Sequence, residues 1–98
     1  MTLEKIQDGS KLTVVINGRL DTNTVIEAEK ELDGVFDDIT ELVWDFKGLD
    51  YISSAGLRVL LSAQKKMNTK GSMKVVGVNK SIMEIFEVTG FTDILTIE

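Results

Sequence analysis

The sequence predicts an α/β fold in which helices pack on at least one face of a mixed β-sheet of about five strands. Short runs rich in β-branched residues alternate with segments whose apolar residues recur at helical spacing. The first two runs are separated only by the turn-forming segment "QDGSK". The expected order is β-β-α-β-α-β-α-β, an opening hairpin followed by right-handed parallel crossovers. A chain of 98 residues is expected to form one domain, residues 1–98.

The N-terminal half is expected to hold the hairpin and the first helix. Its strands are predicted near residues 2–6 and 11–18. A helix should begin after "DTNT" (21–24), because Thr24 and Glu27 have the spacing of a capping box. One apolar stripe follows at helical spacing and should pack against the sheet; it consists of Val25, Ala28, Leu32 and either Val35 or Phe36.

The C-terminal half alternates strands and helices. Residues 41–49, 73–78 and 94–97 are predicted strands, and helices are predicted after the serine pair and over residues 80–90. Ser54 is the expected N-cap of the first of these helices, and Gly71 is expected to end it. Asn79 or Lys80 should lie near the cap of the second helix, and Gly90 should end that one. The stripe of the first helix comprises Leu57, Leu60, Leu61, Gln64 and Met67.

Composition excludes several classes of function. The net charge is -5, with sixteen acidic and eleven basic residues, which argues against a nucleic-acid partner. The chain has no Cys and no His, so the commonest nucleophile, general base and zinc ligands are missing. No apolar run approaches the ~20 residues that span a bilayer, and the N-terminus lacks the pattern of a signal peptide. We expect a cytoplasmic protein without a membrane partner, without a cofactor and without enzymatic activity.

Two segments are candidate sites because parallel strands that feed helices end at one edge of a sheet. They are "RLDTNT" (19–24) and "LDYISSAG" (49–56). A nucleophilic serine is disfavoured, because Ile52 stands where the G-x-S-x-G elbow needs glycine. Ser62 and Lys65 match S-x-x-K, but within a helix and without the partner motifs of that enzyme class.

The acidic residues near these strand ends can be interpreted in two ways. Asp21, Asp45 and Asp50 would hold Mg²⁺ if they converged. They are more simply a cap, a strand-edge charge and a turn residue, and we favour that interpretation.

The helix start "SSAG" is lightly built, and Gly56 costs about 0.5 to 1 kcal/mol relative to Ala inside a helix. This pattern predicts close approach by a second group, either a phosphate at the positive end of the helix or the surface of a partner protein.

Three stretches, "GRLDTNT", "VWDFKGLDYISSAGLRVLL" and "KVVGVNKSIMEIFEVTGF", together resemble the STAS domain, and specifically the small bacterial anti-sigma factor antagonists. The resemblance covers almost the whole chain. Its most specific part is the spacing from Asp45 through Asp50 to Ser54, Gly56 and Leu57.

The resemblance implies a STAS-like fold and a regulated binding protein. Unphosphorylated antagonists of this family bind an anti-sigma factor that is also a serine kinase, free the sigma factor, and are switched off by phosphorylation. A serine phosphatase is then a further partner. The alternative is a STAS adaptor in a larger signalling or lipid-transport assembly, without a phosphorylation switch. A nucleotide-binding role is disfavoured because the phosphate loop is missing.

The resemblance also assigns residues. Ser54 matches the phosphorylated serine, with Ser53 as the second possibility. A well-known version of the motif has Asp before this serine and Ser or Thr after it, where this chain has Ser53 and Ala55. Asp21 matches an acidic residue near the phosphorylation site. The implied partner surface comprises Asp21, Thr22, Asn23, Thr24, Ser53, Ser54, Ala55, Gly56 and Arg58.

Overall fold

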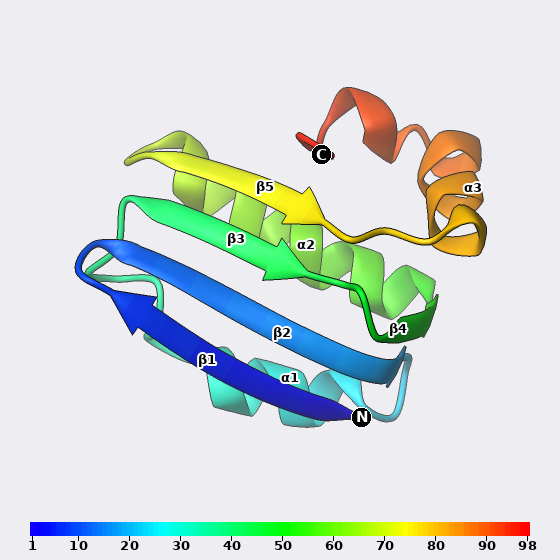
Figure 1. Ribbon diagram of the computed structural model, residues 1–98, viewed down its shortest axis with the longest axis horizontal. Coiled ribbons are helices and arrows are strands. Elements are labelled where there is room, and N and C mark those ends of the chain that lie inside the picture. The colour runs from blue at the N-terminus through cyan, green and yellow to red at the C-terminus, as the bar shows by residue number, and fades with distance from the viewer.

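The computed structural model describes all 98 residues and has five strands and three α-helices. β1 (Thr2–Asp8) and β2 (Lys11–Leu20) form the predicted antiparallel hairpin. β2 then pairs in parallel with β3 (Glu41–Asp45) along its first half and with β4 (Leu49–Ile52) at its last three residues. β5 (Ser72–Val76) pairs in parallel with β3, so the sheet order is β1-β2-β3-β5 (Figure 1).

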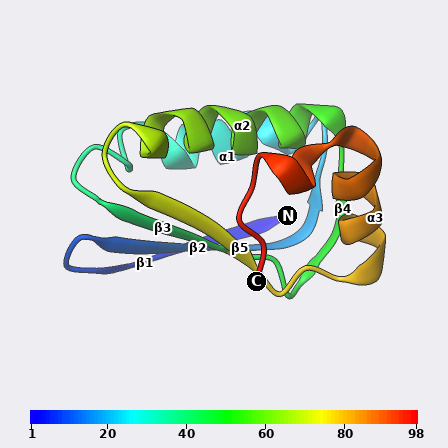
Figure 2. The same cartoon turned by 90° about the horizontal axis from the view of Figure 1, so that it is seen from above.

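The helices are distributed unevenly around this sheet. α1 (Val25–Leu32) and α2 (Ser54–Asn68) lie side by side on one face, and the opposite face carries no helix (Figure 2). α3 (Lys80–Thr89) lies at the end of the sheet beside β4, followed by the short 3-10 helix η1 (Phe91–Asp93). The expected mixed sheet with helices on at least one face is confirmed.

The core lies between the sheet and the two covering helices. The predicted stripe of α1 is buried as expected, and Phe36 rather than Val35 completes it. Phe36 packs edge-on against Trp44 of β3, with ring centroids 6.3 Å apart. The α2 stripe is also confirmed, with only Leu61 half-buried. A core of 23 buried residues therefore fixes α1 and α2 on the sheet.

The number of strands is as expected, but two of the predicted strands need correction. The predicted strand 41–49 ends at Asp45, where the turn of Lys47 and Gly48 redirects the chain, and β4 begins separately at Leu49. The predicted strand 94–97 is not one, since only Ile97 forms an isolated bridge, with Val75. β4 therefore makes up the expected number of strands, but it pairs with β2, whereas the bridge of Ile97 lies on β5.

Three predictions about helix ends also need correction. Thr24 precedes α1, but its hydroxyl caps no helical N–H, so there is no capping box with Glu27. The N-cap of α2 is Ser53 rather than Ser54, and the helix ends at Asn68, before Gly71.

The expectations for α3 are confirmed. Asn79 is its N-cap, and Gly90 ends it in the left-handed conformation with φ of 79°. No helix of the molecule has the length and apolar character needed to cross a membrane.

Candidate functional site

The two segments singled out in the sequence are neighbours at one edge of the sheet. Leu20, at the end of β2, is the parallel partner of Ile52, at the end of β4. The backbone N–H of Ser53 donates to the carbonyl oxygen of Leu20 at 2.9 Å. The loop 21–24 and the start of α2 therefore lie next to each other, as predicted.

The loop after β2 is organised by the carboxylate of Asp21. Its Oδ1 accepts hydrogen bonds from the backbone N–H groups of Asn23 and Thr24, each at 3.0 Å. The Thr24 hydroxyl accepts from the Asp21 N–H at 2.9 Å and donates to the Arg19 carbonyl at 2.8 Å. Since this hydroxyl is engaged in the loop, it is not available to cap α1.

The same hydrogen bonds stabilise the ionised form of the Asp21 carboxyl. The Thr24 N–H contributes most to lowering the pKa of this carboxyl, burial opposes the shift, and the Asn23 N–H and Arg19 side chain also lower the pKa. The site therefore carries a fixed negative charge at neutral pH.

Sequence reasoning missed a link between β2 and β4 that lies beside this loop. The Arg19 Nε is 3.4 Å from Oδ2 of Asp21, and the guanidinium carbon lies 4.4 Å from the centre of the Tyr51 ring. An arginine over an aromatic ring is a cation–π contact. The sequence does place Arg19 two residues before Asp21, which is a sign of their ion pair. The contact with Tyr51 could not be predicted, because Tyr51 was not recognised as a strand residue.

The two serines at the start of α2 differ in their surroundings. The Ser53 side chain is half-buried, and its Oγ accepts a hydrogen bond from the Gly56 N–H at 3.4 Å. Ser54 is exposed, and its hydroxyl makes no hydrogen bond within the chain. It stands at the positive end of a 15-residue helix whose first turn contains no acidic side chain.

Gly56 is close-packed, but by the chain itself. It is buried, and a Cβ built on it would lie 2.7 Å from Cγ1 of Ile52 and 2.9 Å from the carbonyl oxygen of Leu20. The prediction that this glycine leaves room for a phosphate or a partner surface was wrong, because the ends of β4 and β2 fill the space. Gly56 therefore lets α2 seat against the sheet and so positions Ser54.

The remaining predicted site residues divide by exposure. Thr22, Asn23 and Arg58 are exposed on the same end of the molecule, and Ala55 is half-buried against the core. Ile26, which sequence reasoning did not include, is 64% exposed in the first turn of α1. The only sign of it in the sequence was that Ile26 is apolar but lies one position outside the buried stripe of α1.

The acidic residues considered for Mg²⁺ do not form a site. No group of three or more potential metal ligands comes together in the chain. Asp45 accepts a hydrogen bond from the Lys47 N–H at 3.0 Å and stabilises the turn after β3.

Comparison with known proteins identifies the family to which this chain belongs. The family model described as "STAS domain" matches residues 2–98, so the chain belongs to the STAS domain family. Its relatives include BtrV of Bordetella bronchiseptica, named as a candidate anti-sigma factor antagonist, which is 33% identical over 99% of this chain and 84% of that protein. The anti-sigma-B factor antagonist of Staphylococcus aureus is 30% identical over 84% of this chain and 78% of that protein.

Solved structures share the fold. An anti-sigma factor antagonist from Mycobacterium paratuberculosis superposes with a TM-score of 0.88 and 21% identity, covering 98% of this chain and 83% of that chain. SpoIIAA, an anti-sigma factor antagonist from Bacillus, has been solved unphosphorylated and phosphorylated. Both forms give a TM-score of 0.76 and 14% identity, covering 99% of this chain and 87% or 91% of that chain.

Proposed function

We propose that this chain is an anti-sigma factor antagonist controlled by phosphorylation of Ser54. In its unphosphorylated form it binds an anti-sigma factor that is also a serine kinase, and so releases a sigma factor for transcription. Phosphorylation ends this binding, and a serine phosphatase restores it. The chain acts as a binding protein in the cytoplasm and catalyses no reaction of its own.

The exposed hydroxyl of Ser54 is the observation that carries the proposal. A kinase needs an accessible hydroxyl, and Ser54 provides one, whereas the Ser53 oxygen accepts the capping hydrogen bond of α2. Ser53 is also half-buried, so its hydroxyl is less accessible to a kinase than that of Ser54. The positive end of α2 tolerates a phosphate at Ser54. The solved phosphorylated form of SpoIIAA supports the compatibility of this fold with a phosphate.

The chemistry of the site explains how one phosphate would end binding. It adds about 1.5 to 2 negative charges at neutral pH, beside the ionised Asp21. In a partner interface an unpaired added charge costs several kcal/mol, and every ~1.4 kcal/mol is a tenfold change in affinity. About a hundredfold loss of affinity is expected.

The direct test is phosphorylation in vitro. The chain is incubated with ATP and a serine kinase of the anti-sigma factor class from the same organism, and the phosphate is located by mass spectrometry. Phosphate is expected on Ser54, it should persist in Ser53→Ala, and it should be absent from Ser54→Ala. Binding to the same kinase, measured by calorimetry with ADP, should be lost in Ser54→Glu and retained in Ser54→Ala.

Two results would contradict the proposal. Phosphate found on Ser53 and not on Ser54 would contradict the assignment of the phosphorylated residue and transfer it to Ser53. No phosphate at either serine, combined with unchanged binding by Ser54→Glu, would favour the adaptor role.

A further inference from the structure

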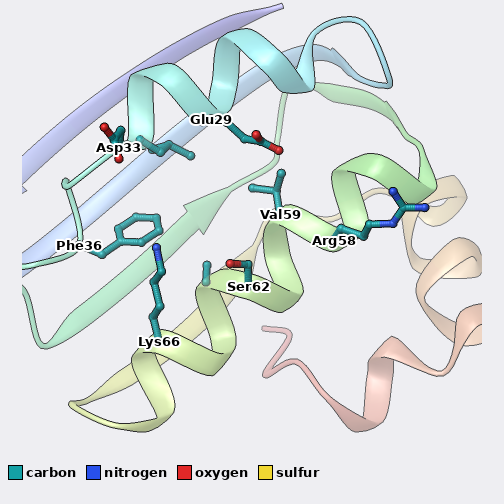
Figure 3. A pocket seen from close by; sticks show the side chains of 9 residues that line it. Glu29, Asp33, Phe36, Arg58, Val59, Ser62 and Lys66 are labelled. Carbon is teal, nitrogen blue, oxygen red and sulfur yellow. The ribbon is translucent and has the colours of Figure 1, made fainter.

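A groove between α1 and α2 adjoins the site described above and shares Arg58 with it. It is open to solvent, has a volume of about 410 Å³, and is bordered by one helix on each side (Figure 3). Its floor is apolar, formed by Leu32 and Phe36 on one side and by Val59 and Ala63 of α2 on the other. The first two keep 7% of their surface exposed, so the groove touches the core.

The two rims of the groove carry opposite charges. Glu29 and Asp33 belong to the α1 side, and Arg58 and Lys66 belong to α2. In Figure 3, Arg58 projects at the N-terminal end of the α2 rim, and Lys66 extends toward Phe36 nearer the other end. The two α2 cations are eight residues apart, which corresponds to about 12 Å along a helix, or roughly two turns.

None of these four charges is paired within the chain. The four salt bridges of the molecule involve other residues, and no side-chain hydrogen bond is made by any of the four. Exposed charges gain little from pairing across a wide, hydrated gap. An acidic rim and a basic rim above an apolar floor are therefore both available to a partner.

We infer that this groove receives an amphipathic α-helix of the anti-sigma factor. The apolar stripe of that helix covers the floor, basic side chains on one flank face Glu29 and Asp33, and acidic side chains on the other flank face Arg58 and Lys66. Helix-in-groove docking uses anchors spaced over about two turns, which matches the length of the α2 rim. This inference rests on the proposed function and extends the proposed partner-binding surface from the start of α2 into the groove.

Charge and position favour this occupant over others. A fatty acid or another amphiphilic anion would leave the acidic rim unpaired, and a nucleic acid would be repelled by it. The groove also adjoins the proposed switch, because Arg58 lies one helical turn after Ser54. A protein that contacts Ser54 therefore reaches the groove without leaving the same face of the molecule.

Two neighbouring lysines provide the test and its control. Lys65 and Lys66 are both exposed on α2, but only Lys66 lines the groove. With the ADP-bound anti-sigma factor kinase as the probe, Lys66→Glu is expected to weaken binding about tenfold or more, and Lys65→Glu by less than about twofold. Ser62→Trp, which fills the groove from its exposed rim without changing charge, should also weaken binding. Thermal unfolding should show that all three variants remain folded.

The outcomes separate this inference from the proposed function. Normal binding by Lys66→Glu and Ser62→Trp, with loss of binding by Ser54→Glu, would overturn the docking role of the groove. The proposal of phosphorylation control at Ser54 would stand. Equal losses of affinity in Lys65→Glu and Lys66→Glu would show that binding depends only on the net charge of the chain. That result would also overturn the inference about the groove. A wild-type dimer that Lys66→Glu converts to a monomer, measured by light scattering, would assign the groove to a second copy. If the wild-type chain neither binds nor is phosphorylated, both proposals fail.

Discussion

Two adjacent serines at the start of α2 differ by a single hydrogen bond. The Ser53 oxygen accepts from Gly56, and the Ser54 oxygen has no partner in the chain. The sequence alone leads to Ser54 as the cap, because either serine satisfies the rule for N-cap residues. The assignment is decided by a tertiary contact, the hydrogen bond from the Ser53 N–H to Leu20, which no local pattern reveals.

Removing the side-chain hydroxyl should therefore lower the stability of the protein at Ser53 but not at Ser54. We expect Ser53→Ala to lower the free energy of unfolding by about 0.5 to 1 kcal/mol, near the lower end of the usual range because the hydrogen bond is long. Ser54→Ala is the matched control and should change it by less than about 0.5 kcal/mol. Urea denaturation of the three proteins measures both values. A larger loss in Ser54→Ala than in Ser53→Ala would refute the cap assignment.

Asp21 should make stability depend on pH. Its pKa is lowered in the folded chain, so the stabilisation from its ionised form is present at neutral pH and is lost as the pH falls through the lowered pKa. Asp21→Asn keeps an oxygen that can accept from Asn23 and Thr24 but removes the charge. We expect this variant to be less stable than the wild type at neutral pH.

The difference between the wild type and Asp21→Asn should shrink progressively below about pH 4. Urea midpoints measured over a pH series give the comparison. A constant difference down to strongly acidic pH would mean that the charge of Asp21 does not contribute to folding.

At the scale of secondary structure elements, the helices with a clear apolar stripe were predictable and two short segments of the C-terminal half were not. The stripes of α1 and α2 were correctly identified because burial against a sheet requires helical periodicity. β4 was missed because it has only four residues, with exposed Asp50 and Tyr51 in its middle, and directly follows a turn. The segment 94–97 has strand-like composition, but η1 precedes it and leaves only Ile97 in register with β5.

β4 matters for the site because it brings the start of α2 beside the loop after β2. It is also tied to α3 through Asn79, whose Oδ1 accepts from the Ile82 N–H at 2.8 Å and whose Nδ2 donates to the Leu49 carbonyl at 2.9 Å. One side chain thus caps α3 and fixes that helix to β4.

Substitutions at Asn79 should separate these two contributions. Asn79→Asp keeps a capping oxygen but loses the donor to Leu49, and is expected to cost about 1 kcal/mol. Asn79→Ala loses both and should cost about 2 kcal/mol. Chemical denaturation measures the free energies. Equal losses in the two variants would show that only the link to Leu49 stabilises the protein.

At the scale of the whole molecule, the sheet brings the proposed phosphorylation site and the groove to one side. The crossover connections place the N-termini of α1 and α2 at the same edge of the sheet, and the two helices then run together across one face (Figure 2). The sequence predicted this edge as a site. It did not predict the groove, because the opposed charges lie on two helices whose spacing depends on how Phe36, Ala63 and their neighbours pack.

The geometry also predicts that the proposed phosphorylation of Ser54 would leave the fold unchanged. Ser54 is exposed, and its side chain contributes no hydrogen bond to the domain. A negative charge there interacts favourably with the N-terminal end of α2, by about 0.3 to 1 kcal/mol. Ser54→Glu is thus expected to have the stability of the wild type or slightly more, with an unchanged circular dichroism spectrum.

Ser53→Glu is the matched control for this prediction. It introduces the same charge one residue earlier, but it replaces the capping oxygen with a longer side chain and should lose about 1 kcal/mol. Thermal unfolding at low ionic strength compares the two variants with the wild type. If Ser54→Glu unfolds at a clearly lower temperature, any loss of partner binding would have to be attributed to altered structure. If it keeps the wild-type stability and still fails to bind, the switch acts through local charge at the interface, because the same fold is then present in both states.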